Sequence, residues 1–228
     1  MKIAIFDVQA GEKQYFTKHL AGHELFFTRD KVDEATAPLA KDCQVLMVFI
    51  TSKLTSKVLA TMPKLKLIIT RSTGFDHIDL EYCERQGIMV TNVPSYGENT
   101  VAEHAFALIL TLSRNIHKSY LRTTREDYRV EGLKGFDLRG KTIGVVGAGK
   151  IGLHLIKMAR GFDMQVLTYD VNRNDFLADV LGFKYVSLEE LLRRSDIISL
   201  HVPENKFTHH LINRQNIGLI KKGALLIN

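Results

Sequence analysis

The stretch Lys141-Thr-Ile-Gly-Val-Val-Gly-Ala-Gly-Lys-Ile-Gly152 places three glycines at G-x-G-x-x-G spacing directly after an apolar run. Gly147 permits a tight turn from strand to helix, and Gly149, which has no Cβ, lets a pyrophosphate approach the backbone. Gly152 lets the helix pack closely on the strand, and the N-terminus of that helix offers unpaired N–H groups to phosphates. The stretch therefore predicts the first half of a dinucleotide-binding unit.

A second apolar run, Gln165-Val-Leu-Thr-Tyr-Asp170, follows a segment of helical spacing and ends in an acid. A carboxylate at this position accepts hydrogen bonds from the ribose hydroxyls and repels a 2′-phosphate, so Asp170 favours NAD over NADP. The nearby Arg173 leaves some use of NADP open. Two other interpretations also remain: glycines that only make a tight turn, and a methyltransferase loop, which carries an acid at the same place.

The composition is typical of a globular protein, with 45% hydrophobic and 25% charged residues among 228. The net charge of +6 comes from scattered basic residues, so we expect no nucleic-acid partner. Neither Cys43 nor Cys83 belongs to a C-x-x-C pair, so we expect no disulfide, no metal site and a cytoplasmic location. No apolar run reaches the ~18 residues of a membrane span, and residues 1–7 fit a strand better than a signal peptide.

Short apolar runs alternate with helix-period segments over the first hundred residues. This alternation predicts parallel strands in a doubly wound α/β sheet. We expect strands at residues 2–6, 24–27, 43–50, 65–70 and 88–91, and helices at 11–23, 56–62 and 80–86. After the dinucleotide unit we expect strands at 185–187, 196–201 and 224–228, and helices at 188–194 and 213–220.

The pattern changes at residues 99–117, which read as one long helix capped by Asn99 or Thr100. Since residues 105–112 are apolar nearly all round, we expect this helix to be buried on more than one side, between domains or subunits. Residues 122–140 are polar and punctuated by glycine, as in a linking loop. About five strands follow residue 140 where a doubly wound nucleotide domain has about six, so we expect the second sheet to be incomplete at its C-terminus.

Several stretches together resemble the D-isomer-specific 2-hydroxyacid dehydrogenases over essentially the whole chain. They are Arg71-Ser-Thr-Gly-Phe-Asp-His-Ile-Asp79, Asn92-Val-Pro-Ser-Tyr96, Val101-Ala-Glu-His104, residues 138–147 and residues 196–203. The resemblance implies a flavodoxin-like substrate domain (residues 1–99), a Rossmann NAD-binding domain (residues 100–228) and an active site in the cleft between them. It also implies a homodimer, formed through the cofactor domain and the helix near residues 99–118.

Within the family, Tyr96 and residues 130–137 look most like the D-lactate dehydrogenase branch. The resemblance makes the Thr73–Gly74 backbone a carboxylate-binding turn and Tyr96 a substrate-facing tyrosine. The other interpretations are a plain strand-to-helix turn and a core aromatic. Phe49 could face the substrate's methyl end, although a core position suits it better. The cofactor-binding positions that the resemblance implies are Val101, Gly147, Gly149, Lys150, Ile151, Gly152, Asp170, Val171, Val202, Pro203 and Thr208.

The catalytic groups of the family are a substrate-orienting arginine and a carboxylate–histidine pair, and all three come after the position that matches Asn228. Reduction of a 2-keto acid needs a cation and a proton donor, and none of the nine histidines here shows such partners in the sequence. We therefore expect an NAD-dependent D-2-hydroxyacid dehydrogenase that converts pyruvate to D-lactate, with these residues alone inactive as a truncated fragment. The alternative is a non-catalytic, NAD-binding regulatory protein of the same fold.

Overall fold

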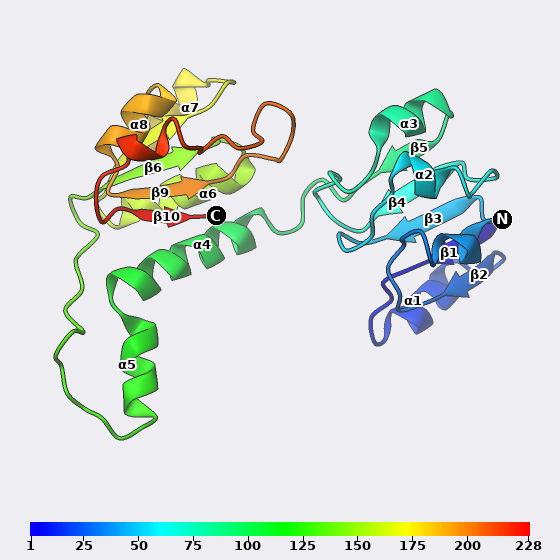
Figure 1. Cartoon of the computed structure of the whole chain (residues 1–228), viewed down its shortest axis with the longest axis horizontal. Helices are drawn as coiled ribbons and strands as arrows, with labels where there is room; N and C mark the ends of the chain where they lie inside the picture. Colours follow the sequence, from blue (N-terminus) through cyan, green and yellow to red (C-terminus); the bar gives the residue numbers. More distant parts are fainter. The chain divides into compact units, whose positions relative to one another are not determined.

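A computed structural model describes residues 1–228 as two compact units, Met1–Tyr96 and Gly97–Asn228. Each unit is built on a five-stranded parallel sheet with helices on both faces (Figure 1). This arrangement confirms the α/β class expected from the alternation of strands and helices. None of the helices has the length and apolar character that a membrane crossing would need.

The sheet of the first unit has the strand order β2-β1-β3-β4-β5, which is the flavodoxin-like order. Helix α1 covers one face, where Phe16 and Leu20 pack against Ile3 and Ile5, and the other helices cover the opposite face. The strands are β1 (Lys2–Ile5), β2 (Glu24–Phe27), β3 (Val45–Val48), β4 (Leu67–Thr70) and β5 (Met89–Thr91). The helices are α1 (Glu12–His19), the 3₁₀ helix η1 (Ala37–Ala40), α2 (Ser56–Leu59) and α3 (Leu80–Arg85).

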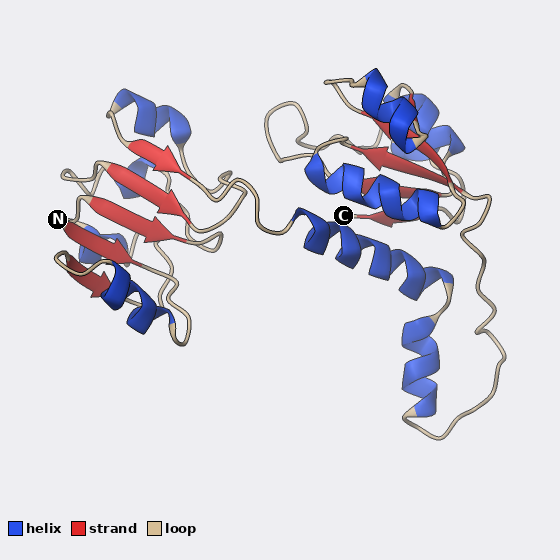
Figure 2. Ribbon diagram, turned by 180° about the vertical axis from the view of Figure 1, so that it is seen from behind, coloured by secondary structure: helices blue, strands red, loops and turns tan.

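The sheet of the second unit has the order β10-β9-β6-β7-β8, in which the first strand is central, as in a Rossmann domain. Its strands are β6 (Thr142–Val146), β7 (Gln165–Tyr169), β8 (Lys184–Tyr185), β9 (Ile197–Leu200) and β10 (Leu225–Ile227). Helix α4 (Glu98–Ser113) lies beside α6 (Lys150–Gly161) on one face (Figure 2), where α7 (Asp175–Leu181) also packs. The other face carries α8 (Leu188–Arg194) and the 3₁₀ helix η2 (Ile217–Leu219).

The single long helix expected at residues 99–117 is wrong, because the chain breaks after α4 and restarts as α5 (Ile116–Thr123). At the break Asn115 takes a left-handed backbone, with φ of 52°. A returning loop stabilises the break, since Phe136 donates its N–H to Ser113 O at 2.9 Å. Gly135 must be a glycine here, because a Cβ would lie 2.0 Å from the same Ser113 oxygen.

The expected cap of this helix also needs correction. Gly97, not Asn99 or Thr100, precedes the first turn of α4, and no side chain caps it. Ala105 and Ile109 are buried in the unit, so one face of α4 belongs to the core. Helix α5 has no buried residue and, with the loop that follows it, projects from the rest of the unit (Figures 1 and 2).

Two smaller elements differ from the expectation. The helix expected at residues 213–220 is only the 3₁₀ turn η2, because the Asn216 side chain accepts the Asn213 N–H and donates to Leu211 O. Helix α7 was not expected from the sequence at all. Asn174 caps its first turn, because the Asn174 side chain accepts the Leu177 N–H.

Candidate functional site

Two of the three fingerprint glycines are required by the chain itself. Gly147 has φ of 98°, and a Cβ on it would lie 2.7 Å from the His201 carbonyl oxygen. A Cβ on Gly152 would lie 1.9 Å from the Gly147 carbonyl oxygen, which is far inside contact distance. The tight turn after β6 and the close packing of α6 therefore explain these two glycines without any ligand.

Nothing in the chain itself requires a glycine at position 149. Its φ of −69° suits any residue, and a Cβ there would meet nothing within 4 Å. Helix α6 starts directly after it without a side-chain cap, and the first bond of the helix runs from Leu153 N–H to Gly149 O. The N–H groups of Lys150 and Ile151 thus precede the helical ladder. This open helix N-terminus fits an anionic phosphate group brought close to the backbone.

Asp170 is held against this turn at the end of β7. Its Oδ2 accepts the Ala148 N–H at 2.6 Å, and its Oδ1 accepts the Asn172 N–H at 2.7 Å. Each oxygen keeps acceptor capacity, so the carboxylate can still receive hydroxyl donors. The neighbouring Arg173 places its guanidinium 5.7 Å from the centre of the Tyr185 ring, and Val171 is 81% exposed.

The remaining predicted cofactor residues lie on the segments around the turn. A Cβ on Gly147 would lie 3.0 Å from the Val202 side chain, so β9 ends directly beside the glycine loop. The Thr208 hydroxyl donates to Pro203 O and closes the loop after β9. Val101 is exposed on the first turn of α4, which the pair between Lys150 Nζ and Glu98 Oε1, 3.3 Å apart, ties to the start of α6.

His201 lies at the end of β9, close to the same loop. Burial lowers its pKa to about 4, and its Nε2 lies 2.8 Å from Ser199 Oγ. The imidazole is therefore neutral at pH 7 and carries no acidic proton to donate. Its place beside the backbone of Gly147 makes it part of the loop's support.

The depressed pKa of His201 predicts a pH-dependent stability. Free histidine titrates near pH 6.5, so below that pH the unfolded chain takes up a proton that the folded chain refuses until about pH 4. Stability is therefore full above about pH 6.5 and falls by up to about 3 kcal/mol as the pH drops toward 4. Between pH 7 and 4.5, the urea midpoint should fall less in His201→Gln than in the wild type. If the urea midpoint fell equally in the wild type and in His201→Gln, His201 would not be the group whose lowered pKa causes the loss of stability.

The first unit places the Thr73–Gly74 turn beyond β4, where both residues are exposed. The Thr73 carbonyl oxygen accepts from Asn92 Nδ2 at 2.8 Å, and the Gly74 carbonyl oxygen accepts from Ser72 Oγ at 2.7 Å. The N–H groups of Thr73 and Gly74 donate to no group of the chain. The turn therefore carries two neighbouring donors without a partner in the chain.

Tyr96 ends this unit and is 62% exposed, which excludes the core interpretation. No hydrogen bond or ring contact joins it to the Thr73–Gly74 turn. Phe49 is half-buried, and its N–H donates to Asp7 Oδ2 at 3.2 Å.

A buried polar group near the turn was missed in the sequence. Asp7 follows β1 with φ of 55° and is 7% exposed. Its carboxylate accepts from the hydroxyls of Thr51 and Ser52. Arg71 donates to both oxygens of Glu12 and to the Phe6 carbonyl, so its guanidinium serves the structure of this edge. An acid directly after a buried strand was the available signal.

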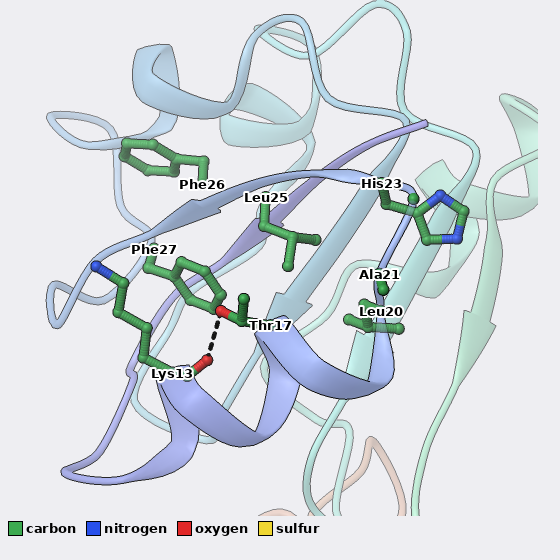
Figure 3. A pocket seen from close by; sticks show the side chains of 9 residues that line it. Lys13, Thr17, Leu20, Ala21, His23, Leu25, Phe26 and Phe27 are labelled. Atoms are coloured by element: carbon green, nitrogen blue, oxygen red, sulfur yellow. Dashed lines mark hydrogen bonds between the residues drawn. The ribbon is translucent and has the colours of Figure 1, made fainter.

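One hollow in the first unit lies away from these residues. It has a volume of about 590 Å³ and runs between α1 and the edge strand β2 (Figure 3). Its walls include Lys13, Leu25 and Phe27, and the Thr17 hydroxyl bonds the Lys13 carbonyl inside it. None of the predicted site residues lines it. No three His, Cys, Asp or Glu side chains gather into a set that could hold a metal ion.

Comparisons with known proteins agree with this geometry. The family model for the NAD-binding domain of D-isomer specific 2-hydroxyacid dehydrogenases matches residues 106–228. The chain belongs to the D-isomer specific 2-hydroxyacid dehydrogenase family. NAD is the cofactor of the domain that carries Gly149 and Asp170.

Several 2-hydroxyacid dehydrogenases are similar along the whole chain. A 2-hydroxyacid dehydrogenase homolog of Haemophilus influenzae is 36% identical over 100% of this chain and 70% of its own length. The D-lactate dehydrogenase of Escherichia coli is 35% identical with the same coverage. The structure of D-lactate dehydrogenase from Aquifex aeolicus with NAD and lactic acid is 39% identical, with a TM-score of 0.93 over 98% of this chain and 67% of that one.

Proposed function

We propose that the chain carries the cofactor and substrate-binding parts of a D-lactate dehydrogenase, which reduces pyruvate to D-lactate with NADH. The observation that carries the proposal is the open N-terminus of α6 at Gly149, with Asp170 fixed beside it. The similar D-lactate dehydrogenases of Escherichia coli and Aquifex aeolicus support the choice of substrate. In this proposal residues 1–99 form the substrate domain and residues 100–228 the cofactor domain.

The cofactor residues have separate roles in the second unit. The N–H groups of Lys150 and Ile151 hold the pyrophosphate, because they lack partners at a positive helix end. Asp170 accepts the ribose hydroxyls, and the exposed Val171 lies under the adenine. Val101 packs against the nicotinamide. Bound NADH supplies the hydride, while Val202, Pro203 and Thr208 border the other side of the cofactor.

The substrate residues come from the first unit. The N–H groups of Thr73 and Gly74 bind the carboxylate of pyruvate without a charged side chain. Tyr96 offers an exposed hydroxyl as a donor to the substrate. These groups bind and orient a keto acid, but they supply no proton for the alkoxide that forms as the carbonyl is reduced.

We expect no turnover from these 228 residues. His77 and His201 are half-buried, and burial lowers the pKa of both. The other histidines are exposed, and the one ion pair between a histidine and an acid, His209 with Glu204, lies on the surface. No histidine of the chain is therefore paired with an acid inside the proposed site, as a proton donor for this reaction would be. Oxidation of NADH by pyruvate should stay at background while NAD binds in calorimetry; turnover above background would overturn the claim.

The alternative function is that of a non-catalytic NAD-binding regulatory protein. The same survey of histidines favours it, because it needs NAD binding and no proton donor. The reading frame of the gene after the codon for Asn228 separates the two candidates. Continuation into an arginine codon would support the dehydrogenase, and a stop codon would support the regulatory protein.

We also propose that the protein is a cytoplasmic homodimer. Helix α5 exposes three large apolar side chains, Ile116, Tyr120 and Leu121, at 50%, 67% and 51%, and a second copy would cover them. The two buried cysteines are free thiols, which suits a reducing compartment. Analytical ultracentrifugation should give a dimer for the wild type and a weaker dimer for Tyr120→Glu. If the wild type and Tyr120→Glu both sediment as monomers, the proposed dimer is contradicted.

A further inference from the structure

A chain of three side chains leads from the interior of the first unit to the carboxylate-binding turn. His77 Nε2 lies 3.2 Å from Thr70 Oγ1, and Thr70 Oγ1 lies 2.6 Å from Ser72 Oγ. The Ser72 hydroxyl in turn donates to Gly74 O at 2.7 Å. Thr70 and Ser72 are 0% and 2% exposed, so water does not compete for these bonds.

The direction of the protons along this chain follows from counting donors. A hydroxyl has one hydrogen, and that of Ser72 is used on Gly74 O. Thr70 must therefore donate to Ser72, and its own hydrogen is then used as well. His77 must donate from Nε2 to Thr70, which fixes the neutral imidazole as the tautomer with a bare Nδ1. Burial lowers the pKa of His77, so the neutral form is the one present at pH 7.

The bond to Gly74 completes an unusual pattern in the turn. Three consecutive peptide groups are each held by their carbonyl oxygen. Ser72 O accepts from Val93 N–H, Thr73 O from Asn92 Nδ2 and Gly74 O from Ser72 Oγ. In a trans peptide the N–H points opposite to the C=O. Accordingly, the N–H groups that follow these carbonyls, those of Thr73, Gly74 and Phe75, donate to no group of the chain.

We propose that His77, Thr70 and Ser72 are positioning residues that hold the Gly74–Phe75 peptide plane, making the Phe75 N–H a third donor for the carboxylate of a 2-keto acid. These side chains do not touch the substrate. They act through the backbone of a glycine, which without an anchor has the most conformational freedom of any residue. The inference rests on the proposed function of the turn and adds to it one donor and the device that orients it.

Nuclear magnetic resonance of the whole chain, with pyruvate as the probe, tests the inference. In the wild type we expect His77 to be protonated at Nε2 only, and pyruvate to shift the amide signals of Thr73, Gly74 and Phe75. Ser72→Ala should bind pyruvate about five- to tenfold more weakly, as expected for one lost hydrogen bond, and should lose the Phe75 shift. Ser72→Thr, which keeps the hydroxyl, should restore both. Affinity for NAD should not change in either variant.

Ser195→Ala is the matched control, because Ser195 is a buried serine of the second unit whose hydroxyl also donates to a carbonyl, Leu191 O. It should leave pyruvate binding unchanged. Wild-type affinity in Ser72→Ala, or a His77 protonated at Nδ1, would overturn the inference while leaving the carboxylate site in place. A wild type in which pyruvate shifts none of the three amides would show that the proposed function of the turn has failed, and the inference would fall with it.

Discussion

Replacing Gly149 with alanine should leave the melting temperature unchanged and weaken NAD binding by about tenfold or more. The backbone of Gly149 suits alanine, and the new Cβ would meet no atom of the chain. In the proposed site it would meet the pyrophosphate that approaches the N-terminus of α6 instead. Disturbing one or more hydrogen bonds to a charged phosphate costs about 1.5–3 kcal/mol. Calorimetric titration with NAD and a thermal melt measure the two effects.

The matched control is Gly152→Ala, two positions beyond the start of α6. Its Cβ would lie 1.9 Å from the Gly147 carbonyl oxygen, so this variant should lose stability by about 2 kcal/mol or more. An equal loss of stability in both variants would contradict the open space at Gly149. Unchanged NAD affinity in Gly149→Ala would show that the phosphates bind elsewhere.

Replacing Asp170 with alanine should lower the affinity for NAD by about tenfold or more and change that for NADP little. In the proposed site the carboxylate is lost as the acceptor of two ribose hydroxyl donors, and each such charged hydrogen bond contributes about 1.5–3 kcal/mol. For NADP, the affinity lost with the hydrogen bonds to the carboxylate is offset, because the carboxylate no longer repels the 2′-phosphate. The preference for NAD over NADP should therefore largely vanish in titrations with the two cofactors.

The variant Asp170→Asn separates the proposed contact with the ribose from the hydrogen bond that supports the glycine loop. Its remaining oxygen can still accept the Ala148 N–H, so its melting temperature should stay near that of the wild type while its preference for NAD falls. Both variants keep Arg173, whose guanidinium lies over the Tyr185 ring. A wild type that binds NADP more tightly than NAD would contradict the role assigned to Asp170.

Local sequence patterns predicted the strands and the dinucleotide unit well, because those features depend on periodicity and on the special properties of glycine. The strand at Val45–Val48 and helix α8 show this directly, since their apolar spacing matches the faces that they bury. The break at Asn115 was different. It depends on residues 133–136 returning to the end of α4, and no pattern within residues 99–117 reports a contact made so far along the chain.

In the candidate site, too, some residues were predictable from the local sequence and others depend on distant contacts. Gly147 and Gly152 were predictable because the positive φ of Gly147 and the contact of Gly152 with the Gly147 carbonyl oxygen arise within one strand–turn–helix segment. Asp170 was predictable because it ends the next strand. The chain from His77 to Gly74 was not predictable. Only the turn back from Asp76 to Ile78 brings His77 beside Thr70, and the hydroxyl directions appear only once the distances are known.

The bond between Ala148 N–H and Asp170 Oδ2 joins the glycine loop to the ribose acid before any cofactor arrives. In the proposed cofactor site, the phosphate contact and the ribose contact would therefore share one hydrogen-bonded element of the protein. Substitutions at the two places should not add: the loss of affinity in Gly149→Ala combined with Asp170→Ala should differ from the sum of the single losses. A substitution that changes the choice between NAD and NADP at Asp170 thus also removes a support of the glycine loop.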